Sequence, residues 1–189
     1  MMKVFICSIS IFCLSYINAQ KPPLKVTVNC TAVVGIYEKD LTDKDGVSLE
    51  YSENTCEVFY KGKLYTGKVK SCKNNKIFGI TNYVNGKIEG ECYGYYENGN
   101  LAIYIVYGKN NSEPEMGYDE ANHRTIMICD GVSNGEEIQY KENGKLWFKG
   151  FNTNGKREGK WYFYDEKGAV MEVRTYKDGE EISCSGKCD

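Results

Sequence analysis

The sequence has little net charge and, after its first nineteen residues, no long apolar run. Its formal net charge is -2, and it would be about -3 without residues 1–19, whose only charged residue is Lys3. So small a charge argues against nucleic-acid binding, which needs a basic face to replace condensed counterions. The lack of an 18-residue apolar run argues against a transmembrane segment after residue 19.

Histidine is also scarce, which bears on catalysis and metal binding. His123 is the single histidine, whereas a zinc site needs four grouped ligands and often includes histidine. No serine or cysteine motif surrounds His123 to make it an acid or base, so we expect it on the surface. The Gly-rich run at 60–68 lacks the helix N-terminus that a phosphate cradle needs. The sequence therefore predicts a protein that is not an enzyme and holds no metal or cofactor.

Residues 1–19 are typical of a secretory signal peptide. Lys3 gives a short positive region, Val4 to Ile17 is mostly apolar, and the stretch ends on the small residue Ala19. The alternative is a retained membrane anchor. Export would permit disulfides among the seven cysteines that follow. We therefore expect a secreted or periplasmic protein.

The chain contains an internal repeat. Three strings align without gaps: GECYGYYENGNL (90–101), GEEIQYKENGKL (135–146) and GKWYFYDEKGAV (159–170). Gly90 to Gly135 is about twice the distance from Gly135 to Gly159, which predicts a degenerate unit at 116–124 between them. Extending the period upstream gives six turn positions, namely Thr55, Lys76, Gly99, Asn122, Gly144 and Gly168.

Each unit is predicted to be a β-hairpin with one apolar face. Tyr93 and Tyr95, six and four residues before the turn at Gly99, are two apart and share a strand face. The second and fourth residues after the turn, Leu101 and Ile103, are expected to share a face of the return strand. One hairpin is marginal in water, so neighbours must stack. We expect an all-β fold, an elongated antiparallel meander of about six tandem β-hairpin repeats.

The repeat also divides the chain into segments. Residues 1–19 are the signal peptide, and 20–45 form an N-terminal capping segment whose residues 24–38 alternate like strands. The repeat array covers 46–182. A cysteine-bearing tail at 183–189 ends the sequence.

Two stretches, YVNGKIEGECYGYYENG (83–99) and FNTNGKREGKWYFYDEKG (151–168), resemble MORN repeats in the variant form common in bacteria. The shared motif is Gly-Lys-x-x-Gly-x-x-Tyr-x-Tyr-x-x-x-Gly, which falls on Gly86, Lys87, Gly90, Tyr93, Tyr95 and Gly99. The resemblance implies a binding and scaffolding module. Similar bacterial chains are often described as antitoxin-like or immunity-like proteins.

Three aromatic residues are the best candidates for a binding site. Trp147, Trp161 and Phe163 have the opposite parity from the repeated tyrosines, so they would face outward if one face is core. Exposed aromatic patches usually mark binding sites. We expect a protein-binding scaffold that is antitoxin-like or immunity-like. The alternative is a cell-wall or glycan binder, because GKWYFYDEKGAV resembles choline-binding wall repeats, whose aromatic cages hold a quaternary amine.

Two further features lead to predictions. In the meander, residue 56 lies opposite about residue 70, which brings Cys56 and Cys72 within reach of a disulfide. Glutamate recurs two residues before the turn, at Glu97, Glu142 and Glu166 among others. This column could bind cations or a basic protein, but a solvated turn shoulder explains it more simply.

Overall fold

The computed structural model describes residues 30–32, 35–48, 57–109, 115–119, 124–128 and 131–188. Its elements are mostly strands, with two 3-10 helices, η1 (Cys30–Ala32) and η2 (Glu38–Asp40). The strands are β1 (Ile36–Tyr37), β2 (Phe59–Tyr60), β3 (Lys63–Leu64), β4 (Gly67–Lys73), β5 (Lys76–Val84), β6 (Lys87–Ile88), β7 (Gly90–Tyr95), β8 (Leu101–Tyr107), β9 (Glu115–Asp119), β10 (Arg124–Ile128), β11 (Ser133–Tyr140), β12 (Leu146–Thr153), β13 (Lys156–Tyr164), β14 (Val170–Lys177) and β15 (Glu180–Gly186). The predicted signal peptide and His123 lie outside the described residues.

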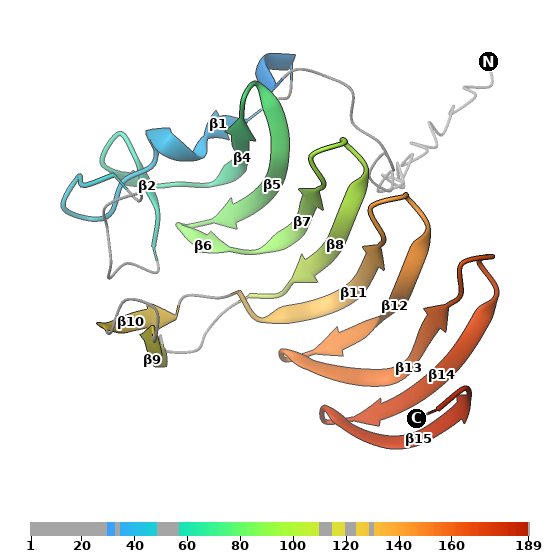
Figure 1. Ribbon diagram of the computed structural model, residues 1–189. Coiled ribbons are helices and arrows are strands. Elements are labelled where there is room, and N and C mark those ends of the chain that lie inside the picture. The colour runs from blue at the N-terminus through green and yellow to red at the C-terminus, as the bar shows by residue number, and fades with distance from the viewer. Residues whose placement is uncertain are drawn as a thin grey trace, which may run out of the picture.

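Most strands join one long sheet, so the predicted all-β meander is confirmed (Figure 1). Its order is β1-β4-β5-β7-β8-β11-β12-β13-β14-β15, and β6 also pairs with β5. Pairing is antiparallel from β4 onward, whereas β1 pairs with β4 in parallel. The ribbon shows a single layer of curved strands with the N-terminal segment beside β4 and β5. Among the described residues, no second sheet covers the later hairpins.

The turns repeat with the predicted period. Gly99, Gly144 and Gly168 have φ of 85°, 82° and 82°, and each closes a loop in which a backbone N–H bonds to the carbonyl four residues later. The predicted turn at Lys76 lies slightly earlier, at Asn74–Asn75, where both residues have positive φ. Two-residue turns such as Asn154–Gly155 connect the hairpins at the other end of the strands.

The degenerate unit does form a hairpin, but it stands outside the long sheet. β9 pairs with β10, with Asp119 opposite Arg124, as a separate two-stranded sheet. β8 instead pairs directly with β11, and the amide of Gly108 donates to the carbonyl of Val132 at 2.8 Å. β2 and β3 form another separate hairpin. The predicted turn at Thr55 lies outside the described residues.

In the long sheet, a β-bulge next to the turns at Asn74–Asn75, Gly99, Gly144 and Gly168 sets which residues share a face. Leu101 pairs with Tyr95, but the extra residue of the bulge then makes Tyr104, rather than Ile103, the residue that shares the face of Tyr93. The prediction that the second and fourth residues after the turn share a face is therefore wrong for this unit. The bulge inserts one residue into the return strand and shifts its alternation.

The two faces of the sheet can be followed through the strand partners. The tyrosine face carries Tyr93, Tyr104, Ile138, Lys149 and Tyr162, which are successive cross-strand partners. The opposite face, which we call the tryptophan face, carries Gln139, Phe148, Phe163 and Trp161.

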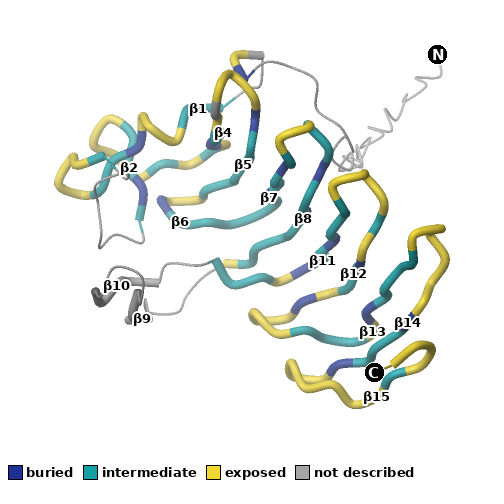
Figure 2. Tube along the Cα trace, viewed as in Figure 1, coloured by how far each residue is buried: buried dark blue, intermediate teal, exposed yellow. Residues whose placement is uncertain are grey.

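The apolar core changes face along the array. In the middle units it lies on the tyrosine face, where Cys30 packs with Tyr95, Leu101 and Ile138. At the C-terminal end a cluster of Phe148, Trp161 and Tyr176 lies on the tryptophan face. Figure 2 accordingly shows buried positions scattered along successive strands. Each core is local, as expected for a repeat array.

The predicted Cys56–Cys72 disulfide is wrong, because Cys72 pairs with Cys30, with their Cα atoms 6.2 Å apart. The prediction assumed that the chain before β4 folds back along it, but β1 occupies that edge of β4 instead. A second disulfide joins Cys184 and Cys188. β15 continues to Gly186, so the sheet extends beyond the predicted array boundary at residue 182.

Candidate functional site

The three predicted aromatic residues gather around a fourth, Phe148. Its ring centroid lies 5.2 Å from that of Trp147, 5.7 Å from Trp161 and 5.6 Å from Phe163. These residues therefore lie close together, but they differ in exposure. Trp147 is 47% exposed, Phe163 is half-buried, and Trp161 is fully buried.

The burial of Trp161 contradicts the expectation that it faces outward. Gly150 on β12 lies directly beneath the indole, and a Cβ there would be 2.2 Å from the ring. The indole N–H donates to the carbonyl of Phe151 at 3.2 Å. The tryptophan thus fills a hollow made by a glycine in the neighbouring strand. Parity alone cannot reveal this, because it identifies the face of a residue and not its neighbours.

Arg157 covers the same cluster. Its guanidinium lies 4.3 Å from the ring centroid of Trp161, 5.3 Å from Tyr176 and 5.7 Å from Phe148. It donates one hydrogen bond, to Tyr176 Oη at 3.2 Å. Sequence analysis missed this residue, although Arg157 and Trp161 are four apart in one strand and therefore share a face.

A second arginine on this face is held by acids. Arg174 forms ion pairs with Glu172 and, at 3.2 Å, with Glu181. Its guanidinium also lies 5.5 Å from the ring of Phe163. Glu172 is itself buried, so Arg174 neutralises a carboxylate that could not be buried alone.

An exposed apolar patch lies where β12 and β14 leave their turns. We define the terminal apolar patch as the exposed Trp147, Val170 and Met171 together with the half-buried Leu146 and Tyr164. Leu146 and Val170 are the repeat equivalents of Leu101, since each pairs with the tyrosine four residues before its turn. Leu101 is 2% exposed in the core beneath Cys30, whereas Val170 is 51% exposed.

The tyrosine face holds a carboxylate between two phenols. Tyr93 and Tyr104 donate to separate oxygens of Glu91, at 2.5 and 3.0 Å. Burial, followed by the hydrogen bond to Glu91 and its charge, raises the pKa of Tyr104 to about 12. The same causes raise the pKa of Tyr93. These phenols therefore remain protonated donors at neutral pH.

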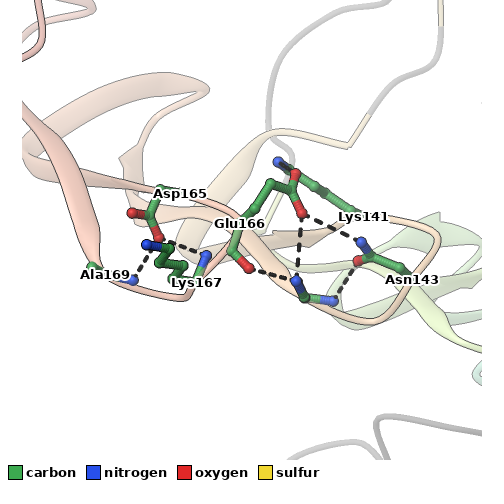
Figure 3. Close-up of polar contacts among 7 residues, drawn as sticks. Lys141, Asn143, Asp165, Glu166, Lys167 and Ala169 are labelled. Atoms are coloured by element: carbon green, nitrogen blue, oxygen red, sulfur yellow. Dashed lines mark hydrogen bonds and ion pairs between the residues drawn. The ribbon is translucent and has the colours of Figure 1, made fainter.

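The glutamate column lies at the turns and makes contacts between successive turns, which neither interpretation predicted. Glu166 bonds to Lys141 and Asn143 of the preceding turn (Figure 3). The carbonyl of Glu142 accepts from the side-chain amides of Asn98 and Asn100, at 2.9 and 2.8 Å. In the described turns, this column supplies contacts between neighbouring repeats.

An open pocket near the disulfide offers little chemistry. Tyr37, Glu38, Lys39, Lys70 and Asn75 contribute to its lining. Lys70 is buried, donates to the carbonyl of Cys30 at 3.0 Å and lies 4.3 Å from the ring of Tyr37. Its ammonium is thus already used to hold the N-terminal segment.

Within the described ranges, no group of three or more His, Cys, Asp or Glu side chains is arranged to hold a metal ion. None of the helices described there has the length and apolar character needed to cross a bilayer. No protein-family model, curated protein or solved structure matches the chain significantly.

Proposed function

We propose that this protein is an exported, non-enzymatic scaffold that binds another protein, and that its repeats are of the MORN type. The observation that carries this proposal is the exposure of the terminal apolar patch. Equivalent repeat positions are buried by the N-terminal segment around Leu101 but open to solvent at Val170. A contiguous group of exposed apolar side chains commonly marks a protein-binding surface.

The remaining features agree with such a role. A single-layer sheet presents an extended surface, which repeat proteins use for binding. The two disulfides among the described residues suit an exported chain. The resemblance to antitoxin-like and immunity-like chains supports a protein partner, and a secreted or periplasmic location follows from the signal-like residues 1–19.

The test is affinity capture with the exported chain, residues 20–189, from an envelope extract of the source organism. Trp147→Ser combined with Met171→Ser removes two exposed patch residues, and circular dichroism shows whether losing the contact of Trp147 with Phe148 changes the fold. Phe151→Ser is the matched control, since Phe151 is 51% exposed but lies outside the patch. We expect one stoichiometric protein that the double variant loses at least tenfold and the control retains.

The alternative, wall or glycan binding through exposed aromatics, has less support because Trp161 is buried and cannot line an open cage. The same experiment separates the two functions. Retention on wall material without a stoichiometric protein, with release by free glycan or choline, would overturn the scaffold proposal.

A further inference from the structure

The two arginines of the tryptophan face have different partners. Arg174 is paired with two carboxylates, Glu172 and Glu181. Arg157 forms no ion pair within the described part of the chain, and its one hydrogen bond goes to the phenol of Tyr176. Because a guanidinium has five N–H donors, most of those on Arg157 are available to a ligand.

Arg157 is also held in place before any ligand binds. Its guanidinium stacks over Trp161, which is fully buried, and Tyr176, which is 7% exposed. A guanidinium stacked on a ring keeps its N–H edge free for a planar anion. Since the rings already restrict the side chain, little further ordering opposes binding.

The surroundings of Arg157 are ordered and partly dehydrated. Asn152, its cross-strand partner on β12, is buried and donates its amide to Glu137 at 2.7 Å. Strand pairing occupies the backbone on this part of the sheet, as in the pairing of Gly159 with Tyr176. The guanidinium is therefore the principal donor that this surface offers.

We propose that Arg157 is a binding site for the carboxylate of an acidic side chain on a partner protein. Such a carboxylate can accept two parallel N–H bonds from one guanidinium. This site lies on the tryptophan face and does not depend on the terminal apolar patch.

The neighbouring charges favour a carboxylate over a phosphate. Glu137 is linked to Arg157 through Asn152, and Glu172 and Glu181 surround the other arginine. These acids repel a dianion more strongly than a monoanion. A free C-terminal carboxylate is usually held by a nest of backbone N–H groups, which a paired strand does not present.

The test follows the side-chain Nε–Hε signal of Arg157 by NMR while a probe is added to the full exported chain. The probe is a short peptide with two glutamates and blocked ends. A glutamine version, the glutamine version with a free C-terminus, and inorganic phosphate are the comparison probes. Arg157→Lys keeps the charge but not the planar fork, and Arg174→Lys is the matched control.

We expect a saturable shift with the glutamate peptide only. Affinity should fall at least tenfold in Arg157→Lys and stay within about threefold in Arg174→Lys. No saturable shift, equal affinity in Arg157→Lys, or tighter binding of phosphate or of the free C-terminus would overturn the proposal. Circular dichroism of both variants identifies any loss that comes from misfolding.

Discussion

At the scale of single residues, the C-terminal core depends on a glycine, because Gly150 has no side chain to occupy the space that Trp161 fills. Trp161 is buried in a one-layer sheet because Gly150 leaves room beneath it and Arg157 lies over it. The pattern of alternating residues placed Trp161 and Phe163 on the face opposite the tyrosines but did not predict the burial of Trp161. The glycine beneath Trp161, rather than the parity of the tryptophan itself, decides its exposure.

We predict that Gly150→Ala destabilises the fold by about 1–3 kcal/mol, because the new Cβ would lie 2.2 Å from the indole and force repacking. The matched control is Gly79→Ala, also within a strand, whose Cβ would meet no atom closer than 3.4 Å. Urea unfolding followed by circular dichroism gives both free energies. Equal stability of the two variants would contradict this account of the core.

Tyr104 should make the fold sensitive to alkali. Its pKa is raised to about 12, above the ordinary value near 10, by burial and then by the hydrogen bond and charge of Glu91. The folded state therefore holds the proton more tightly, so this stabilisation is complete below pH 10 and is lost as the pH rises toward 12. Burial also raises the pKa of Tyr83 to about 12, so the deprotonation of Tyr83 adds to the same loss of stability at high pH.

Tyr104→Phe should lower stability at pH 7, by about 1–3 kcal/mol, because a hydrogen bond to a carboxylate is removed. Between pH 10 and pH 12 the melting temperature of this variant should fall less than that of the unaltered chain. Thermal melts at each pH make the comparison. Parallel curves would show that Tyr104 does not titrate with folding.

At the scale of elements, the positions of the turns could be predicted from the sequence. Which residues share a face of the strand after a turn could not. Gly99, Gly144 and Gly168 occupy the turn positions that the period gave. The bulge that places Tyr104 opposite Tyr93 depends on loop geometry, which a count of residues does not contain. The same applies to the disulfide, since β1, a distant segment, takes the edge of β4.

The sequence contains a signal for the separation of the β9–β10 hairpin from the long sheet. Five units begin with a glycine of positive φ, namely Gly46, Gly67, Gly90, Gly135 and Gly159. The degenerate unit has Glu113 at the equivalent position, and a residue with a side chain rarely adopts that conformation. The repeat pattern identified a hairpin there, but the bend that returns a hairpin to the sheet needs the glycine.

The two disulfides should differ in their effect on stability. Cys30 and Cys72 are 42 residues apart, whereas Cys184 and Cys188 are four apart. Loop closure in the unfolded chain predicts a loss of about 4 kcal/mol without the first and about 2 kcal/mol without the second.

Urea unfolding of Cys30→Ala/Cys72→Ser and of Cys184→Ser/Cys188→Ser measures the difference. Non-reducing peptide mapping of the unaltered chain should recover a fragment that joins residues 30 and 72. A fragment that joins 56 and 72 instead would contradict the structure.

At the scale of the whole molecule, the pairing of the long sheet does not include the β9–β10 hairpin. Gly108 and Val132 are hydrogen-bonded to each other, and β8 pairs directly with β11. We predict that replacing residues 109–131 by a two-residue Asn-Gly turn leaves the fold intact, with a melting temperature within a few degrees of the original.

Far-UV circular dichroism and a thermal melt test this replacement. The terminal apolar patch should keep its partner in the shortened chain, because β12 and β14 are untouched. Loss of cooperative unfolding would show that the β9–β10 hairpin is needed to join the two halves of the sheet.

The meander also determines how the molecule yields to force. Its last strand, β15, is bonded only to β14 within the described sheet, and no layer clamps the two together from above. A pull at the C-terminus therefore loads one pair of strands at a time, as in opening a zipper. The other end of the sheet is cross-linked by the Cys30–Cys72 disulfide. We therefore expect optical tweezers to record extension in steps of the length of one hairpin. A single rupture of the whole sheet would contradict this.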